Sequence, residues 1–174
     1  KKSAKKEYNK EIYFLDKSVL KIYNFKTKEA EEKYLDYFNL FSKFHQYHFE
    51  YGKLDSGETY ILSDLISNYK IDYSTRLFLL SEYILEVNNF FNDSFYYFFY
   101  DPTIVNIFYN GKEMVLIDES QFAKRDSWDL FVTDIIFIFG QAINSDFVCN
   151  RISEIDKKNI KDKVFYCIDR VLNN

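Results

Sequence analysis

The sequence predicts an α+β fold in one domain of two small lobes, over residues 1–174. In the first half, short segments rich in β-branched and aromatic residues come in pairs around turn residues, which indicates a small antiparallel sheet. Apolar residues recur at helical spacing once in that half and three times in the second half. Because 47% of its residues are hydrophobic, the chain can bury a core without disulfides or metal. We therefore expect a sheet lobe over residues 1–63 and a reduced, mainly helical lobe over residues 64–174.

The sheet lobe is predicted as two hairpins with a helix between them. Residues 11–15 and 18–23 form the first hairpin, and Lys21 lies on its second strand. Residues 28–44 form the helix, because acids gather near its start and apolar residues recur at helical spacing, namely Leu35, Phe38, Phe41 and Phe44. Residues 49–53 and 58–62 form the second hairpin, and residues 63–66 leave it as a connecting segment.

The helical lobe is predicted from three periodic segments and one further hairpin. Residues 74–91 form an amphipathic helix that leads into an aromatic stretch, which we expect to pack under the hairpin that follows. Residues 104–109 and 113–117 are strands joined through Asn110-Gly111, a strong hairpin signal. Residues 128–143 form a buried helix, and a terminal helix is marked by its apolar positions, Ile160, Val164, Ile168 and Val171.

Charge and cysteine usage limit the classes of function. A net charge of −4 argues against a general nucleic-acid binder, which needs many cations along the phosphate backbone. Cys149 and Cys167 lack zinc-type spacing, so we expect reduced thiols in a cytosolic setting. His45 and His48 have no third partner and are expected at the helix end or surface. The apolar run at residues 130–140 is too short to span a bilayer, and we see no signal peptide.

The most informative motif is Asp101-Pro-Thr-Ile-Val-Asn106, followed by the Asn110-Gly111 hairpin and then Asp118. Two carboxylates and one amide are thereby expected at the mouth of one hairpin. Phosphoryl transfer depends on positioning and on neutralising phosphate charge, and oxygen ligands of this kind suit Mg²⁺. Singly, Asp101-Pro102 is equally compatible with a turn, Asn106 with a strand and Asp118 with a loop cap. The functional interpretation therefore depends on their order along the chain.

That order resembles a protein-kinase-like fold, from about Glu11 to Gly140. Val19-Leu20-Lys21-Ile22 is similar to the Val-Ala-Ile-Lys strand of the family, which implies that Lys21 binds phosphate. The resemblance implies a helix acid beside this lysine. Register favours Glu32, and the alternatives stay open: Glu29, Glu31 and Asp36.

The resemblance also assigns roles in the connecting segment and in the motif. Asp101 would accept the proton of the substrate hydroxyl, while Asn106 and Asp118 would bind the metal ion. The nucleotide would contact Lys21, Asn106, Asp118 and three residues of the connecting segment, namely Ser63, Asp64 and Leu65. Asp129 or Asp134 would bond to the catalytic loop, or would be a helix-face or capping acid.

The chain also departs from the pattern of the family. Phe99-Tyr100 stands where His-Arg is usual, and Asp118-Glu119-Ser120 replaces Asp-Phe-Gly. No Gly-x-Gly-x-x-Gly motif precedes Lys21, and no Ala-Pro-Glu segment follows. Regulation through a phosphorylated activation loop is therefore not expected. The chain is more similar to short atypical kinases, which include bacterial effector kinases, RIO-type kinases and lipopolysaccharide-core sugar kinases.

The sequence therefore predicts a minimal atypical kinase that uses ATP and Mg²⁺ to phosphorylate a hydroxyl of Ser, Thr or Tyr in a protein. A pseudokinase or binding module without catalysis is one alternative, favoured by the missing glycine-rich loop. A sugar or small-molecule kinase is the other. The expected partners are a nucleotide and a protein substrate, with no nucleic acid and no membrane span. The expected location is the cytoplasm, or a host cytosol if the chain is an effector.

Overall fold

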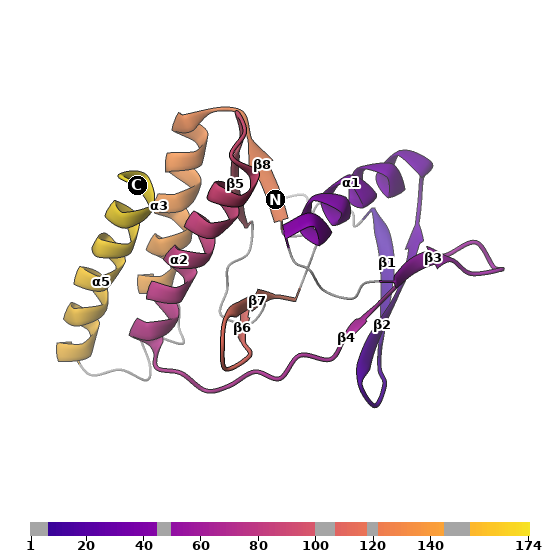
Figure 1. The fold of residues 1–174 in the computed structure, drawn as a ribbon, viewed down its shortest axis with the longest axis horizontal. Helices are drawn as coiled ribbons and strands as arrows, with labels where there is room; N and C mark the ends of the chain where they lie inside the picture. Colours follow the sequence, from indigo (N-terminus) through magenta and orange to yellow (C-terminus); the bar gives the residue numbers. More distant parts are fainter. Residues whose placement is uncertain (1–6, 45–49, 100–106, 118–121, 145–153) are drawn as a thin grey trace. The chain divides into compact units, whose positions relative to one another are not determined.

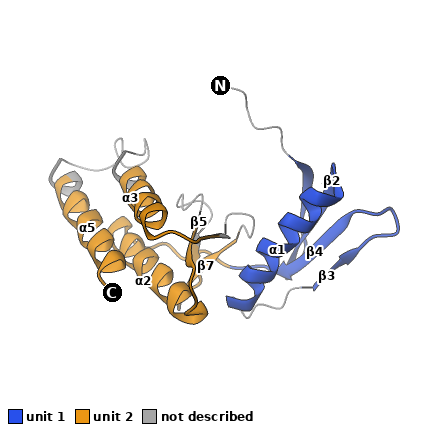
Figure 2. Cartoon of the chain, turned by 90° about the horizontal axis from the view of Figure 1, so that it is seen from above, with its two compact units in different colours: residues 1–66 blue, residues 67–174 orange. Residues whose placement is uncertain are grey.

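The chain divides into two compact units, residues 1–66 and residues 67–174 (Figure 2). Each unit combines α-helical structure with antiparallel strands, so the predicted α+β class is confirmed. The parts of the chain that this computed structural model describes are residues 7–44, 50–99, 107–117, 122–144 and 154–174.

Unit 1 is a four-stranded antiparallel sheet with one helix, and its strands are ordered β1-β2-β4-β3 (Figure 1). Both predicted hairpins and the predicted helix are confirmed, and the helix has the predicted bounds. The elements are β1 (Tyr8–Phe14), β2 (Ser18–Phe25), α1 (Lys28–Phe44), β3 (Glu50–Lys53) and β4 (Thr59–Asp64).

The core of unit 1 forms where α1 packs on one face of the sheet. Tyr23 and Ile61 from the sheet, together with Tyr34 and Phe38 from the helix, are between 0% and 4% exposed. The Tyr23 and Tyr34 ring centroids lie 4.7 Å apart. The Thr27 hydroxyl accepts a hydrogen bond from the backbone N–H of Ala30 at 3.1 Å, which satisfies one of the free donors at the start of α1. Aromatic burial and capping together fix the helix against the sheet.

The prediction that residues 63–66 form a connecting segment is wrong for residues 63 and 64. Ser63 and Asp64 are the last residues of β4, where they pair with Val19 and Ser18 of β2. Pairing continues this far because β2 already begins at Ser18, so β4 has a partner up to Asp64. Leu65 then donates its backbone N–H to the carbonyl of Lys17 at 3.0 Å. The connection to unit 2 therefore begins after Leu65.

The described residues of unit 2 form three helices and two separate two-stranded ladders, in which β5 pairs with β8 and β6 pairs with β7. Helix α5 packs against both α2 and α3, and α3 also contacts β5 and β8 (Figure 1). The elements are α2 (Tyr73–Phe91), β5 (Tyr96–Phe99), β6 (Ile107–Tyr109), β7 (Met114–Leu116), β8 (Phe122–Arg125), α3 (Trp128–Asn144) and α5 (Glu154–Leu172).

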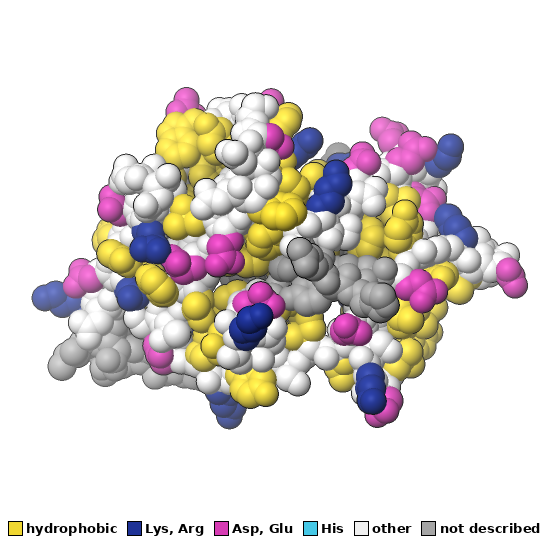
Figure 3. Space-filling view, in the orientation of Figure 1, with side chains coloured by type: hydrophobic (Ala, Val, Ile, Leu, Met, Phe, Trp, Pro, Cys, Tyr) yellow, Lys and Arg dark blue, Asp and Glu magenta, His cyan; other side chains and the backbone are white. Residues whose placement is uncertain are grey.

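The sequence predicts the three helices and the β6–β7 hairpin of unit 2, but not the β5–β8 pair. The predicted burial of α3 is confirmed on one side of the helix only, because Leu130, Ile136 and Phe137 are 50%, 51% and 58% exposed. On the face seen in Figure 3, acidic and basic side chains are interspersed over both units. Within the described ranges, every helix is too short or too polar to cross a membrane.

Candidate functional site

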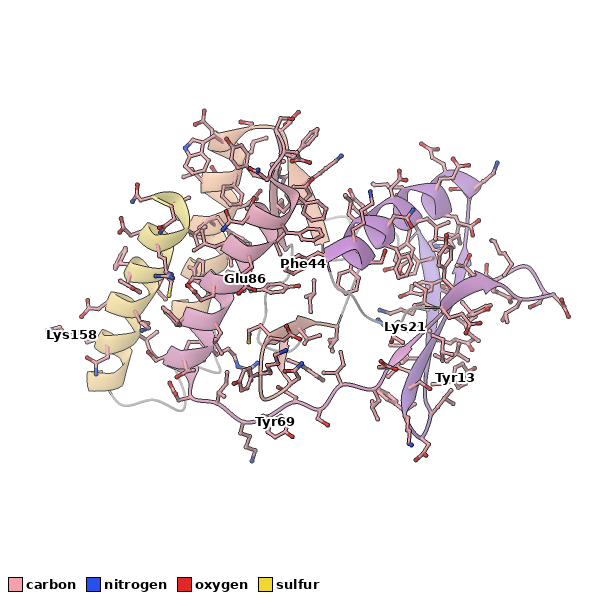
Figure 4. The ribbon with its side chains drawn as sticks, in the orientation of Figure 1. Tyr13, Lys21, Phe44, Tyr69, Glu86 and Lys158 are labelled. Atoms are coloured by element: carbon pink, nitrogen blue, oxygen red, sulfur yellow. The ribbon has the colours of Figure 1, made fainter. Side chains whose placement is uncertain are left out.

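Lys21 lies in the interior of β2 and is only 8% exposed (Figure 4). Its register partners are Ile12 on β1 and Ile61 on β4. Directly paired residues of an antiparallel sheet project from the same face, so Lys21 shares its face with Ile61, which packs toward α1. Burial of an ammonium group is costly unless the group is paired. At 8% exposure, Lys21 is therefore not a solvated lysine on the strand surface.

The sheet face around Lys21 also carries exposed apolar side chains. Ile12 and Phe14 alternate along β1 on this face and are 44% and 74% exposed. Ser63 projects from the same face, because it pairs with Val19 two residues from Lys21. Asp64, one residue further, projects from the opposite face. A buried cation beside apolar side chains and a hydroxyl is the mixture found in small-molecule sites.

The acids of α1 divide between its sheet side and its solvent side. Glu31 is 16% exposed, contacts Lys53 of β3 in an ion pair and accepts a hydrogen bond from the Thr59 hydroxyl. The hydrogen bond from Lys53 holds the pKa of the Glu31 carboxyl below its ordinary value. Glu32 is 64% exposed and forms its ion pair with Lys28 one turn earlier, at 3.4 Å.

The structure therefore places Glu32, the acid that the sequence favours as partner of Lys21, on the solvent side of α1. The two other acids considered, Glu29 and Asp36, are also exposed. Glu31 is the acid that reaches the sheet. It reaches β4 at Thr59, whose partner on β2 is Tyr23, two residues from Lys21.

The β6–β7 hairpin provides the scaffold for the motif residues of unit 2. Its turn is fixed by the Asn110 side chain, whose Oδ1 accepts backbone hydrogen bonds from Lys112 and Glu113, both at 2.9 Å. Gly111 has a φ of +96°, which only glycine adopts without strain. All three residues of β7 are buried. The hairpin is therefore a firmly anchored element with a defined register.

The registers of the two ladders relate the motif residues to one another. Phe99 pairs with Phe122 at the end of the β5–β8 ladder, and Ile107 pairs with Leu116 at the end of the β6–β7 ladder. Residues 100–106 lead from the first of these ends to the second, and residues 117–121 lead back. Both segments are therefore tied at each end to the same two ladders. The first segment contains Asp101 and Asn106 and the second contains Asp118, three residues that lie outside the described part of the chain.

Asn88 anchors β5, the strand that leads into the first of these segments. Its side-chain amide donates to the carbonyls of Ile84 and Tyr97, at 2.8 and 2.9 Å, and its Oδ1 accepts the backbone N–H of Tyr97 at 2.8 Å. The amide thus takes the place of a neighbouring strand at Tyr97. Helix α2 ends at Phe91 and is capped by Asn92, which adopts a left-handed φ of 42°. The Tyr97 hydroxyl donates to Asp93 at 2.7 Å, and burial raises the pKa of this tyrosine.

The segment before α2 is hydrogen-bonded to β6 in a similar way. Tyr69 donates its backbone N–H to the carbonyl of Tyr109 at 2.7 Å, and the Asn68 side chain accepts the N–H of Tyr109 at 3.1 Å. Tyr69, labelled in Figure 4, also lies beside Gly111. No sequence signal marks Asn68 or Asn88 for these roles, because neither belongs to a turn motif and asparagine is common at exposed positions.

The acids of α3 have described roles of their own. Asp134 pairs with Arg125 of β8 at 2.7 Å, which ties the end of the β5–β8 ladder to the helix. Asp129 lies exposed in the first turn of α3, where a carboxylate favours the helix dipole. Among the side chains that the structure describes, no group of three or more His, Cys, Asp or Glu residues is arranged to hold a metal ion. The predicted metal ligands, Asn106 and Asp118, are not among those side chains.

Comparison of the chain with protein-family models, with curated protein sequences and with solved structures finds no match.

Proposed function

We propose that the chain is a minimal kinase, which transfers the γ-phosphoryl group of ATP to a hydroxyl of Ser, Thr or Tyr in a protein. The hydroxyl oxygen forms a bond to the γ-phosphorus, the bond from that phosphorus to the β–γ bridging oxygen breaks, and ADP leaves. Asp101 takes the proton of the attacking hydroxyl. Lys21 balances phosphate charge. Asn106 and Asp118 would hold Mg²⁺, which neutralises charge on the β- and γ-phosphates.

The observation that carries this proposal is that residues 100–106 and residues 117–121 both run between the ends of the same two separate ladders in unit 2, at Phe99–Phe122 and at Ile107–Leu116. A metal ligand pair and a proton acceptor must converge on one phosphoryl group, although they come from distant positions in the sequence. Two segments that join the same two ladder ends meet that requirement better than two unrelated loops. The defined register from Ile107 to Leu116 supports the proposal further, since Asn106 and Asp118 adjoin the same end of one hairpin.

The buried position of Lys21 supports the proposal from unit 1. A buried lysine with an exposed apolar pair at Ile12 and Phe14 suits a ligand that carries both a base and phosphates. Glu32 is exposed and pairs with Lys28, so it does not support the role of partner to Lys21 that the resemblance implies. The proposal therefore depends on Lys21 and not on Glu32.

A binding module without catalysis is the second candidate, and the β1–β2 turn favours it. The turn closes with a hydrogen bond from the N–H of Leu15 to the carbonyl of Ser18, at 2.8 Å, and contains no glycine to approach a phosphate. Tyr13, Phe14 and Leu15 are between 46% and 74% exposed beside it. Exposed apolar side chains at a hairpin end are typical of surfaces that contact other proteins.

The experiment that separates the two candidates measures nucleotide affinity, with and without Mg²⁺, and transfer of labelled phosphate to proteins of a lysate. Asp118→Ala should lose the metal-dependent part of nucleotide binding. Asp101→Ala should bind nucleotide and lose transfer. Lys21→Met keeps the apolar stem and removes the charge, so it should lower the transfer rate by a factor of about 100 or more.

Two exposed residues provide matched controls, Lys33→Met on α1 and Asp162→Ala on α5, and both should leave binding and transfer unchanged. Nucleotide binding without transfer in the wild-type chain would favour the second candidate. Absence of both binding and transfer, with the controls folded, would contradict the kinase proposal. Labelled glycans or metabolites in place of labelled protein would identify a small-molecule kinase.

A further inference from the structure

Helix α3 is apolar on two opposite faces, and only one of them is buried within unit 2. The buried face contains Phe131, Ile135, Ile138 and Phe139, each at most 4% exposed. The other face carries Leu130 and Phe137, which are 50% and 58% exposed. Large apolar side chains that gather in the solvent-exposed part of one helix often mark a contact surface. The outer face of α3 is therefore a candidate contact surface.

The outer face has a regular order of large and small residues. Leu130, Thr133, Phe137 and Gly140 are spaced i, i+3, i+7 and i+10, so they form one stripe along the helix. The stripe contains no ionisable side chain. Asp134, the acid inside its span, is paired with Arg125. We call these four residues the α3 stripe.

We propose that the α3 stripe joins two copies of this chain, with their α3 helices antiparallel about a two-fold axis level with Ile135. In that arrangement Leu130 of one copy lies opposite Gly140 of the other, and Phe137 lies opposite Thr133. Each layer therefore places a large side chain against a small one, and the same pairs recur on the other side of the axis. This is the a-to-d layering of an antiparallel helix pair, and an isologous contact of the kind that closes a dimer.

The order of side-chain sizes favours a second copy over an unrelated partner. Large and small residues alternate along the stripe as Leu130, Thr133, Phe137 and Gly140, so in an antiparallel second copy each large side chain faces a small one. Space is also available at Gly140, because a Cβ atom added there would meet no atom within 4 Å. The stripe spans three helical turns, and a contact of that length buries less than about 1,200 Å², the range of weak and transient complexes. The dimer is therefore expected to form at micromolar to millimolar concentrations.

The test is sedimentation equilibrium of the full chain from about 1 µM to about 1 mM, a range that brackets weak association. The wild type should pass from monomer to dimer and form no larger species. Gly140→Leu should keep the monomer folded, since the added side chain has room and leucine favours a helix more than glycine does. It should nevertheless abolish the dimer, because it fills the hole that receives Leu130.

Phe137→Ala should weaken dimerisation at least tenfold, whereas Phe165→Ala on α5, a 66% exposed residue outside the stripe, should not change it. A wild-type chain that stays monomeric throughout the range overturns the proposal. Equal weakening by Phe137→Ala and Phe165→Ala overturns it as well. A fall in the melting temperature of the Gly140→Leu monomer would show that another part of the same chain covers the stripe, which also contradicts the proposal. The inference does not depend on the proposed kinase activity.

Discussion

Replacement of Asn88 by alanine should destabilise unit 2 by about 2–4 kcal/mol, because its side chain forms hydrogen bonds with both backbone polar groups of one buried residue. Tyr97 is 1% exposed, and its N–H and carbonyl both bond to the Asn88 amide. Each buried backbone group that loses its partner costs about 1–3 kcal/mol. Alanine has a higher helix propensity than asparagine and returns at most about 0.7 kcal/mol. The lost hydrogen bonds therefore outweigh the gain.

Unfolding of unit 2 can be followed through Trp128, the single tryptophan of the chain. Its ring lies 5.2 Å from that of Tyr96, the neighbour of Tyr97 on β5, so its fluorescence reports on the affected region. The free energy of unfolding is obtained from urea titrations of the wild type and of Asn88→Ala. Asn89→Ala is the matched control, because Asn89 lies exposed on the same helix and should change stability by less than about 0.5 kcal/mol.

A second variant, Asn88→Asp, separates the acceptor role of the amide from its donor role. Asn88→Asp keeps an oxygen that can accept the N–H of Tyr97 but replaces the donor with an acceptor that faces two carbonyls. At neutral pH this variant should therefore be at least as destabilising as Asn88→Ala. At low pH it should be less destabilising than at neutral pH, because a protonated carboxyl can donate a hydrogen bond again. A loss below about 1 kcal/mol in Asn88→Ala would refute the idea that this amide is what holds β5.

Two further predictions concern carboxylates with shifted pKa values. Glu31→Gln should destabilise unit 1 by about 1 kcal/mol at pH 7. Because the folded pKa of Glu31 is lowered, this difference should begin to shrink as pH falls below about 4 and should vanish once pH has fallen through the folded pKa, as measured by urea titration. Glu86→Gln should act in the opposite direction: burial, together with the charges of Glu82 and Glu113, raises the pKa of Glu86, so the charged form opposes folding. The amide should raise the melting temperature slightly at pH 7 and have no effect below about pH 4, and a loss of stability at pH 7 would contradict the sign.

Elements with a local signature could be predicted from the sequence. The helix over residues 28–44 is found with the predicted bounds, because its apolar spacing, its early acids and its position between two strands agree. The Asn110-Gly111 turn is likewise found where it was predicted, since the left-handed φ of Gly111 is a local requirement. Prediction succeeds here because the interactions that decide each structure lie within a few residues of one another.

Features that depend on distant partners could not be predicted in the same way. The aromatic run at β5 has no polar alternation, and its strand character depends on β8, more than twenty residues further along. Which of Glu31 and Glu32 faces the sheet likewise depends on distant partners. Neighbouring helix positions differ by about 100° in direction, so a shift of one residue decides whether a carboxylate reaches the sheet or solvent. That rotation is fixed by how Tyr34 and Phe38 pack, which the acidic pattern does not encode.

The two polar anchors of unit 2 have a common consequence for the candidate site. Asn88 holds the strand that leads into residues 100–106, and Asn68 holds β6, which follows them. Both use a side-chain amide to satisfy backbone groups that a third strand would otherwise pair. Short ladders of three and four residues bury little apolar surface, so they need such anchors to keep a fixed register. If residues 101–106 act in phosphoryl transfer, loss of either amide should lower the transfer rate more than it lowers nucleotide affinity, because positioning and not binding would be lost.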